Sequence, residues 1–319
     1  MFFSVIIPVY NRPREVDELL HSLTQQTYKN FETLIIEDGS ENRCDDIVEK
    51  YQDQLDIRYY YKENSGQGFS RNFGFERAKG DYFIVFDSDC LIPSHYFETV
   101  ENYLKTHQLD AFGGPDREHE SFSPIQKAIS YTMTSPLTTG GIRGNKKHAG
   151  TFHPRSFNMG ISREVYEQTG GYRITRMGED IEFSIRIINN GFKTGLIPDA
   201  YVYHKRRTSL KKFFNQLHFF GRARININRF HPGEIKFIHT LPALFTVGLL
   251  LFLTLPFWNL SLFKILLIPL ILFVSLIFAH SSTKYSSMYI GLLSVSATFI
   301  QLTGYGIGFL SEFWEEQKE

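Results

Sequence analysis

The chain has 319 residues, with 34 basic and 34 acidic side chains and a formal net charge of zero. This length suggests one large domain or two. A neutral chain that is 42% apolar is neither a disordered tail nor a basic nucleic-acid binder. Two cysteines, Cys44 and Cys90, exclude a disulfide scaffold, and no Cys/His cluster indicates structural zinc. The N-terminal run lacks a basic region before a long apolar core, so we expect no cleaved signal peptide and a first domain that folds in the cytosol.

Strands and helices are predicted to alternate through the first part of the chain. A continuous apolar run predicts a buried strand at 4–10, and further strands are predicted at 31–37, 57–62 and 82–86. Amphipathic patterns predict helices at 16–25, 44–54 and 70–78. This alternation implies right-handed crossovers and an α/β fold, a mostly parallel sheet with helices on both faces.

Polar residues follow three of these strands. Asn11 follows the first strand, Glu37-Asp38-Gly39-Ser40 ends the second, and Asp87-Ser88-Asp89 follows the fourth. Ligands of such sheets bind at the carboxyl ends of the strands, so we expect one site at this edge. An Asp-x-Asp pair is common in surface turns, but here it follows a buried strand. Its hard oxygen ligands suit Mg²⁺ or Mn²⁺, which neutralise phosphate oxygens.

Gly66 and Gly68 suggest a dinucleotide fingerprint only superficially. They follow the third strand instead of the first, and Arg71 stands where the final glycine belongs, so we reject that reading. These glycines are instead expected to let residues 64–72 turn tightly and bring Arg71 toward a diphosphate.

Two further features have two readings each. Glu179 and Asp180 precede an amphipathic helical run at 181–187, where an acid can cap a helix or act as general base for an attacking hydroxyl. His204 closes a strand-like run at 200–203 and can be a metal ligand or a structural histidine.

Six segments stand in order along the chain: Pro8-Val9-Tyr10-Asn11, Glu37-Asp38-Gly39-Ser40, Ser70-Arg71-Asn72-Phe73-Gly74, Asp87-Ser88-Asp89, Gly178-Glu179-Asp180-Ile181-Glu182 and Pro198-Asp199-Ala200-Tyr201-Val202-Tyr203-His204. Together they resemble the family 2 glycosyltransferases, which have the Rossmann-like GT-A fold. The resemblance covers about residues 3–204. It implies an inverting, metal-dependent transfer from a nucleoside-diphosphate sugar, usually a UDP-sugar.

The resemblance also implies roles for individual residues. Pro8, Tyr10, Asp38 and Arg71 would hold the nucleoside and the diphosphate, with Asn11 and Glu179 in the same donor site. Asp87 would lie near the ribose or the metal, Asp89 would bind the metal, and His204 matches a position often close to the metal or the diphosphate. Asp180 would act as general base, and Asn158, within 157–160, would line the donor sugar. The family commonly has two aspartates where Glu37 and Asp38 stand, which leaves Asp38 as the base-reading carboxylate.

The zero net charge is an average over unlike parts. Residues 1–204 carry −7, residues 205–237 carry +8 and the remainder carries −1. Three nearly chargeless stretches, 241–258, 260–279 and 288–310, predict three transmembrane helices within 238–319, although a buried helical hairpin is the alternative. The positive-inside rule places the basic segment in the cytosol and the acidic tail on the far side.

Within the basic segment, apolar residues from Leu210 to Phe220 recur at helical spacing with lysines opposite. This pattern predicts an interfacial helix on anionic lipid, or an ordinary domain-edge helix. The segments 214–224 and 231–233 resemble the membrane-bound subgroup that builds bacterial exopolysaccharides, such as the succinoglycan-type glucosyltransferases. Gln216 is not followed by the Arg-Trp of processive synthases, which argues for addition of one sugar per encounter.

We therefore expect three regions: a GT-A catalytic domain at 1–204, a basic juxtamembrane segment at 205–237 and transmembrane helices at 238–319. The expected acceptor is a polyprenyl-diphosphate-linked saccharide at the cytosolic face of a bacterial inner membrane, with residues 113–157 on the acceptor side. The alternatives are a polyprenyl-phosphate sugar synthase and a membrane scaffold with an inactive transferase domain. A nucleotidyltransferase would need a basic glycine-rich loop after the first strand, where residues 8–13 lack one.

Overall fold

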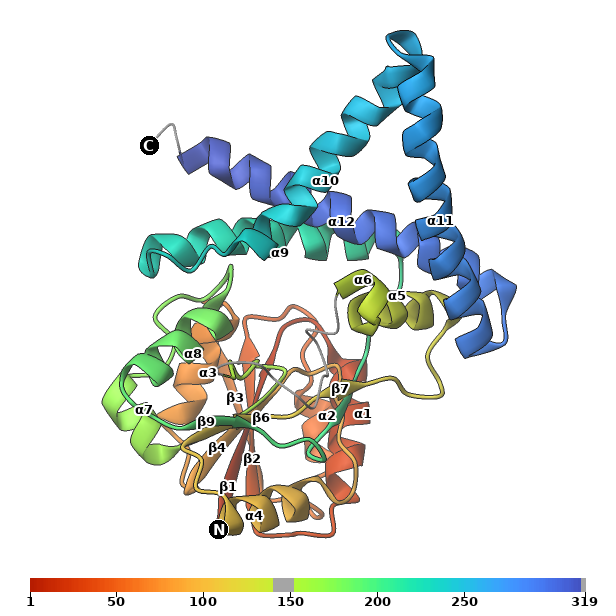
Figure 1. Cartoon of the computed structure of the whole chain (residues 1–319). Coiled ribbons are helices and arrows are strands. Elements are labelled where there is room, and N and C mark those ends of the chain that lie inside the picture. The colour runs from red at the N-terminus through yellow and green to blue at the C-terminus, as the bar shows by residue number, and fades with distance from the viewer. Residues whose placement is uncertain (140–151, 317–319) are drawn as a thin grey trace. The chain divides into compact units, whose positions relative to one another are not determined.

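The computed structural model describes residues 1–139 and 152–316, which form two compact units (Figure 1). Residues 1–119 and 152–205 make up the sheet unit, and residues 120–139 and 206–316 make up the helical unit. A short segment inside the predicted catalytic domain therefore packs with the C-terminal helices. Of the predicted acceptor-side segment, residues 140–151 lie outside the described residues.

The sheet unit contains a seven-stranded sheet in the order β3-β2-β1-β4-β8-β6-β9. The strands are β1 (Phe3–Val9), β2 (Phe31–Asp38), β3 (Ile57–Lys62), β4 (Tyr82–Phe86), β6 (Ala111–Gly113), β8 (Asn158–Ser162) and β9 (Thr194–Leu196). The first four are mutually parallel, and β8 runs antiparallel to β4 and β6. The predicted α/β fold with a mostly parallel sheet is thus confirmed.

Helices cover both faces of this sheet because its strands are apolar on both sides. In β1, Val5 and Ile7 belong to one buried cluster and Ile6 belongs to the other. The first cluster includes residues of α1 (Pro13–Thr24), α2 (Asp45–Glu49) and α4 (Tyr96–Thr106). The second includes residues of α3 (Gln67–Phe75), α7 (Arg163–Thr169) and α8 (Glu179–Asn189). Burial on both faces is the expected pattern for a parallel sheet.

A small second sheet completes the sheet unit. It consists of β5 (Cys90–Leu91), β10 (Val202–His204) and β7 (Asp116–Arg117), in the order β5-β10-β7. Strand β10 pairs antiparallel with β5, and this register sets His204 opposite Cys90. The end of β4 and the end of the predicted catalytic domain thereby meet at one place.

The helical unit consists of α5 (Pro124–Thr134), α6 (Pro136–Thr139), α9 (Leu210–Phe230), α10 (Phe237–Thr254), a 3-10 turn η1 (Leu255–Phe257), α11 (Leu260–Tyr285) and α12 (Met288–Glu316). Three segments, Phe237–Phe257, Leu260–Tyr285 and Met288–Glu315, are long and apolar enough to cross a membrane. Length and composition therefore support a membrane-associated C-terminal region.

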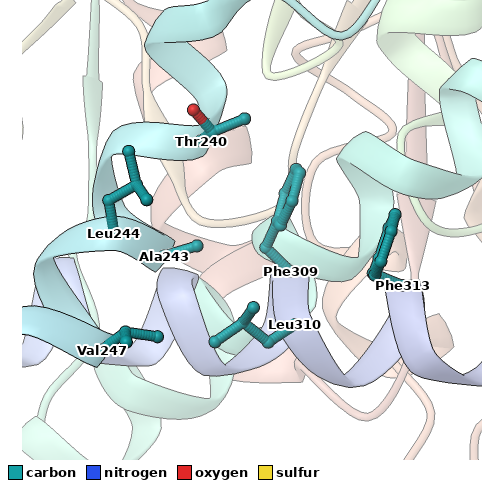
Figure 2. Close-up of a pocket in the computed structure, with 7 residues that line it drawn as sticks. All are labelled: Thr240, Ala243, Leu244, Val247, Phe309, Leu310 and Phe313. Carbon is teal, nitrogen blue, oxygen red and sulfur yellow. The ribbon is translucent and has the colours of Figure 1, made fainter. Parts of the chain in front are cut away.

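Helix α12 packs against α9 with the two backbones close together. A Cβ on Gly221 of α9 would lie 2.1 Å from the carbonyl oxygen of Tyr305, and one on Gly308 of α12 would lie 2.0 Å from that of His218. Only glycine permits such an approach from both sides. On its other side, α12 and α10 border an apolar groove of about 240 Å³ (Figure 2).

Candidate active site

Arg71 is the buried centre of the predicted site. It lies in α3, which begins after Gly66, a residue with a φ of +86°. Its Nη2 contacts Asp87 Oδ1 at 2.9 Å and its Nη1 contacts Glu179 Oε1 at 3.2 Å. Asp87 follows β4 and Glu179 begins α8, so one guanidinium joins two elements far apart in the sequence. Glu179 is also held by a hydrogen bond from the side chain of Gln67.

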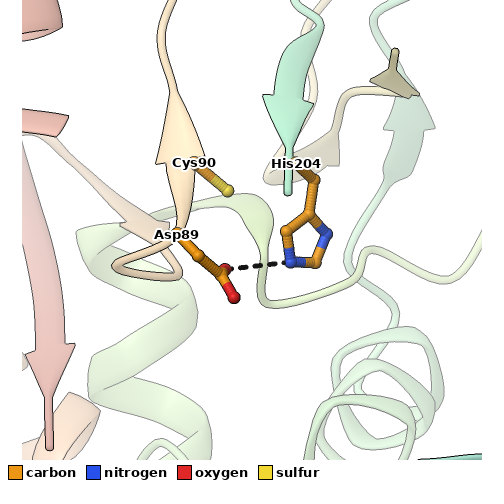
Figure 3. Close-up of side chains that lie close together, drawn as sticks. All are labelled: Asp89, Cys90 and His204. Carbon is orange, nitrogen blue, oxygen red and sulfur yellow. Dashed lines mark ion pairs between the residues drawn. The ribbon is translucent and has the colours of Figure 1, made fainter. Parts of the chain in front are cut away.

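The turn after β4 meets the end of β10 at Asp89 and His204. Asp89 Oδ1 lies 3.1 Å from His204 Nε2 (Figure 3). Asp89 Oδ2 accepts a hydrogen bond from Arg12 Nη1 at 2.6 Å. His204 Nε2 also lies 4.0 Å from Asp87 Oδ2. Burial favours the neutral form of Asp89, but His204 and Arg12 outweigh it and hold the pKa of this carboxyl well below its usual range.

Potential metal ligands of Asp89, Cys90 and His204 lie within 4.8 Å of one another (Figure 3). Cys90 is the weak member, because its thiol donates to the Phe157 carbonyl oxygen at 3.5 Å and burial raises its pKa well above the usual value. A thiol must lose its proton to bind a metal. Asp87, whose side chain is 34% exposed, offers a carboxylate from the same turn.

Asp87, Asp89 and His204, the three residues that the resemblance assigns to the metal, therefore offer the better donor set. Two carboxylates and one imidazole fit Mn²⁺ or Mg²⁺ by chemistry. The His204 ring stacks on Phe157, with 5.1 Å between ring centroids, and this contact holds its Nε2 edge toward the two carboxylates. Within the described residues, the buried Nδ1 of His204 has no hydrogen-bond partner.

Asp180 lies in the first turn of α8, beside Glu179. The residue before the helix is Gly178, with a φ of +95°, and no side chain caps this end. Asp180 Oδ1 accepts a hydrogen bond from the Ile181 amide at 2.9 Å, so this acid satisfies one donor of the first turn. Asp180 is partly exposed, and its Oδ2 lies 3.4 Å from Arg155 Nη1. Burial and the neighbouring charge of Asp180 raise the pKa of Glu179, while Arg71 opposes that shift.

Asp38 is enclosed at the end of β2. Its Oδ1 accepts hydrogen bonds from Lys62 Nζ at 2.6 Å and from the Ser65 amide at 2.9 Å, and its Oδ2 accepts one from the Gly66 amide at 2.9 Å. Burial raises the pKa of Asp38, but these donors outweigh it and lower the pKa below the usual value. The carboxylate thus fixes the loop that leads into α3 and Arg71.

Glu37 has a different environment from Asp38. It is fully buried and accepts hydrogen bonds from the Ser40 hydroxyl and, at 2.9 Å, from the Cys44 amide. Its oxygens are therefore used inside the protein to shape the loop between β2 and α2.

The end of β1 and the loop after it contain three predicted donor-site residues. Pro8 pairs in register with Ile36, and Tyr10 is 53% exposed at the sheet edge. Asn11 has a φ of +53°, its amide donates to Ser40 Oγ at 2.7 Å, and its Oδ1 accepts from two amides of the loop after β2. Asn11 therefore ties together the loops after two neighbouring strands.

Asn158, predicted to line the donor sugar, is completely buried in β8. Its Nδ2 donates to the Ala200 carbonyl oxygen at 2.8 Å, and its Oδ1 accepts from the Tyr96 hydroxyl at 2.5 Å. The structure thus places its amide among protein partners, next to the segment that leads to β10.

Sequence reasoning missed three residues of this cluster: Arg12, Gln67 and Arg155. Arg12 directly follows Asn11 at the sheet edge, which is the one local signal that could have suggested it. Nothing in the spacing links it to Asp89, 77 residues later. Gln67 and Arg155 lie in segments whose approach to α8 depends on the folded chain.

Comparison with known proteins gives consistent matches. The family model described as glycosyl transferase family 2 matches residues 4–170. A *Methanococcus voltae* dolichyl N-acetyl-alpha-D-glucosaminyl phosphate 3-beta-D-2,3-diacetamido-2,3-dideoxy-beta-D-glucuronosyltransferase is 26% identical over 275 residues, covering 79% of this chain and 84% of that protein. The chain spans only 22% and 62% of the length of the first curated relatives it matches.

Solved structures show the same fold. The mannosyltransferase PcManGT from *Pyrobaculum calidifontis*, in complex with GDP-Man and Mn²⁺, has a TM-score of 0.71 at 15% identity, over 98% of this chain and 87% of its own. Residues 1–349 of TarS from *S. aureus*, in complex with UDP-GlcNAc, have a TM-score of 0.51 at 19% identity, over 100% of this chain and 93% of their own. At these identities the likeness concerns the fold alone.

Proposed function

Because this chain belongs to glycosyltransferase family 2, we propose that it transfers a sugar, with inversion, from a nucleoside-diphosphate sugar to a hydroxyl of a membrane-associated acceptor. The observation that carries this proposal is the position of Arg71, which contacts Asp87 on one side and Glu179, the neighbour of Asp180, on the other. A cation for a diphosphate thereby lies between candidate metal ligands and a candidate base.

The donor side uses the sheet edge. Asp87, Asp89 and His204 would hold Mg²⁺ or Mn²⁺, which when bound neutralises negative charge on the leaving diphosphate. The Pro8–Asn11 loop and Asp38 would surround the nucleoside. We propose UDP as the nucleotide of the donor. The UDP-GlcNAc complex of TarS supports this choice, whereas PcManGT was solved with GDP-Man, so a test must include both nucleotides.

Asp180 would serve as general base. It accepts the proton of the acceptor hydroxyl as the hydroxyl oxygen bonds to the anomeric carbon, while the bond from that carbon to the diphosphate oxygen breaks. The partial exposure of Asp180 supports this role, since an acceptor must reach its carboxylate. Glu179 and Gln67 would hold the start of α8, and hence Asp180, in position.

The proposed acceptor is a polyprenyl-diphosphate-linked saccharide used in cell-surface polysaccharide synthesis of the exopolysaccharide type. The basic segment at 205–237 and the apolar helices after it support a lipid-linked substrate. The printed name of the *M. voltae* relative, whose acceptor is a sugar on dolichyl phosphate, supports it as well. We place the protein in a bacterial inner membrane with the sheet unit in the cytosol.

The test is a transfer assay with the full-length protein in lipid nanodiscs. UDP-sugars and GDP-mannose are each supplied with Mn²⁺ or Mg²⁺ and with either lipid-linked saccharides or free sugars. We expect transfer from a UDP-sugar to the lipid-linked saccharide, lost on addition of EDTA. Equal transfer to a free sugar would contradict the lipid-linked acceptor. Mass spectrometry of a product with one sugar on a bare polyprenyl phosphate would identify a polyprenyl-phosphate sugar synthase instead.

A further inference from the structure

The three apolar helices of the helical unit have unequal surroundings. Within segments Phe237–Phe257 and Leu260–Tyr285, 18-residue stretches have mean hydropathies of 2.0 and 2.7, with 11% and 6% of their residues buried. The corresponding stretch of Met288–Glu315 has a mean hydropathy of 1.4, with 39% buried. Helices α10 and α11 thus expose apolar side chains nearly all round, as a helix in lipid does, whereas α12 is covered in places by α5, α9, α10 and α11.

The longest contact of α12 is the one with α9. Gly304 of α12 is next to Leu217, Gly308 is next to His218, and Glu312 pairs with Arg222 at 2.7 Å. Residue numbers rise together on both helices, so the two run in the same direction. Figure 1 shows α12 beside α9, while α10 and α11 lead away to a shared turn.

This contact is long. It begins where Phe213 and Ala297 share a buried cluster and extends to Arg229, whose Nη1 lies 3.2 Å from Glu312. Sixteen residues of helix span about 24 Å. Two helices aligned over that length have nearly the same inclination to a membrane.

Helix α9 is long enough to cross a membrane but has the wrong composition. It carries five basic residues, Lys211, Lys212, Arg222, Arg224 and Arg229. Cations within a bilayer are costly, and α9 is not among the segments apolar enough to span. If α12 crossed, it would draw α9 and its arginines across with it.

We propose that only α10 and α11 cross the membrane, and that α12 lies with α9 in the membrane–water interface on the side of the sheet unit. The pair presents two kinds of group to a lipid surface. Its arginines suit anionic headgroups. Exposed apolar residues of α12, Leu292, Ile307, Phe313 and Trp314, suit the acyl boundary. The end of α12 then lies on the cytosolic side of the membrane. The three apolar stretches alone predict the opposite, that this end emerges on the far side.

The apolar groove fits this arrangement. It is lined by Thr240, Ala243, Leu244 and Val247 of α10 and by Phe309, Leu310 and Phe313 of α12 (Figure 2). Where a spanning helix meets a surface helix, the space between them faces lipid hydrocarbon. The apolar side chains that line this groove can pack against an acyl or prenyl chain, whereas water would be disfavoured there.

Thiol labelling of the full-length protein in spheroplasts, with a membrane-impermeant maleimide, tests the proposal. The native Cys44 and Cys90 are buried and give a low background. Three exposed positions are changed singly: Glu315→Cys near the end of α12, Trp258→Cys at the α10–α11 turn, and Met288→Cys at the start of α12. Trp258→Cys serves as the reference for the outer side of the membrane, and Met288→Cys serves as the reference for the cytosolic side.

We expect Trp258→Cys to react in intact spheroplasts, and Met288→Cys and Glu315→Cys to react only after permeabilisation. Reaction of Glu315→Cys in intact spheroplasts would show that α12 crosses and would overturn the proposal. Failure of Trp258→Cys to react there would overturn the two-helix hairpin. A Glu315→Cys thiol that stays unlabelled in both preparations would also count against a surface helix, whose end must lie in water.

Discussion

The two units each hold a cluster of arginine and acid, with the roles of the charges exchanged. In the sheet unit, the cation Arg71 and the acid Glu179 are both buried, and the acid Asp87 is the more exposed partner. In the helical unit, the buried member is an anion, Glu312, between Arg222 and Arg229. The more exposed partners are therefore the carboxylate of Asp87 in one cluster and two guanidinium groups in the other.

This difference in the charge of the exposed groups matches the ligand proposed for each unit. Asp87, 34% exposed, offers an oxygen to a cation at the sheet edge. Arg222 and Arg229, 34% and 30% exposed, offer N–H donors to an anionic surface. A buried counter-charge holds the outer groups in place in both cases, and its sign decides which ligand the outer groups can take.

The largest expected effect separates chemistry from structure in the sheet-unit cluster. Asp180→Asn removes the proposed base but none of the Arg71 ion pairs. The transfer rate should fall by about 10²–10⁴-fold. UDP affinity, measured by calorimetry, should stay within about threefold. Transfer that survives within a few fold would show that Asp180 is not the base.

Arg71→Met tests the buried cation itself. It leaves Glu179 buried without its counter-charge, so we expect a loss of about 3–5 kcal/mol in the stability of the sheet unit. Hydrogen exchange of β4 and α8 amides in the full-length protein measures it. Amides of α9 and α12 serve as the internal control and should be unchanged. Exchange that is unaltered in β4 and α8 would mean that the cluster contributes no stability.

Asp38→Asn extends the comparison to pH. Because the folded protein lowers the pKa of Asp38, its ionised form stabilises the fold above the usual aspartate value, and this stability is lost as the pH falls through the folded pKa. Each unit of pKa lowering corresponds to about 1.4 kcal/mol. The variant should unfold more easily than the wild type at pH 7, and thermal unfolding should show that difference shrinking toward pH 3. A difference in stability between the two proteins that does not change with pH would contradict a role for the Asp38 charge.

Glu312→Gln should have the smallest effect. The two arginines it releases are partly exposed and can turn to water or lipid headgroups, so we expect a loss of about 1 kcal/mol or less. Thermal unfolding in detergent measures it, with Arg71→Met as the reference. A loss as large as that of Arg71→Met would mean that both clusters depend on burial alike.

The parts of the fold that the sequence predicted are those with long local signals. Strands β1 to β4 each have at least five residues of strand-forming sequence, and their parallel direction follows from alternation with helices. Strands β6, β8 and β9 have only three to five residues, and the antiparallel pairing of β8 with β4 depends on contacts across more than 70 residues. No local pattern encodes such a pairing.

The residues of the candidate site also divide into those with a local sequence motif and those whose position depends on the fold. Asp87, Asp89 and Asp180 stand in short motifs, so their participation could be predicted from residue type and position. Arg12 could not, because its partner Asp89 is set by the sheet and not by spacing. The packing of α5 with the C-terminal helices was equally hidden, since an 11-residue helix after a proline has no sequence mark of its partner.

Asn11 has a consequence for the energetics of donor binding. Its unusual backbone angle and its three hydrogen bonds already order the loops after β1 and β2. A nucleotide that binds there does not have to restrict those loops, so less of its interaction energy is spent on conformational entropy. The sheet edge is in this sense preorganised before any donor arrives, and Asn11 contributes through both its backbone amide and its side-chain oxygen.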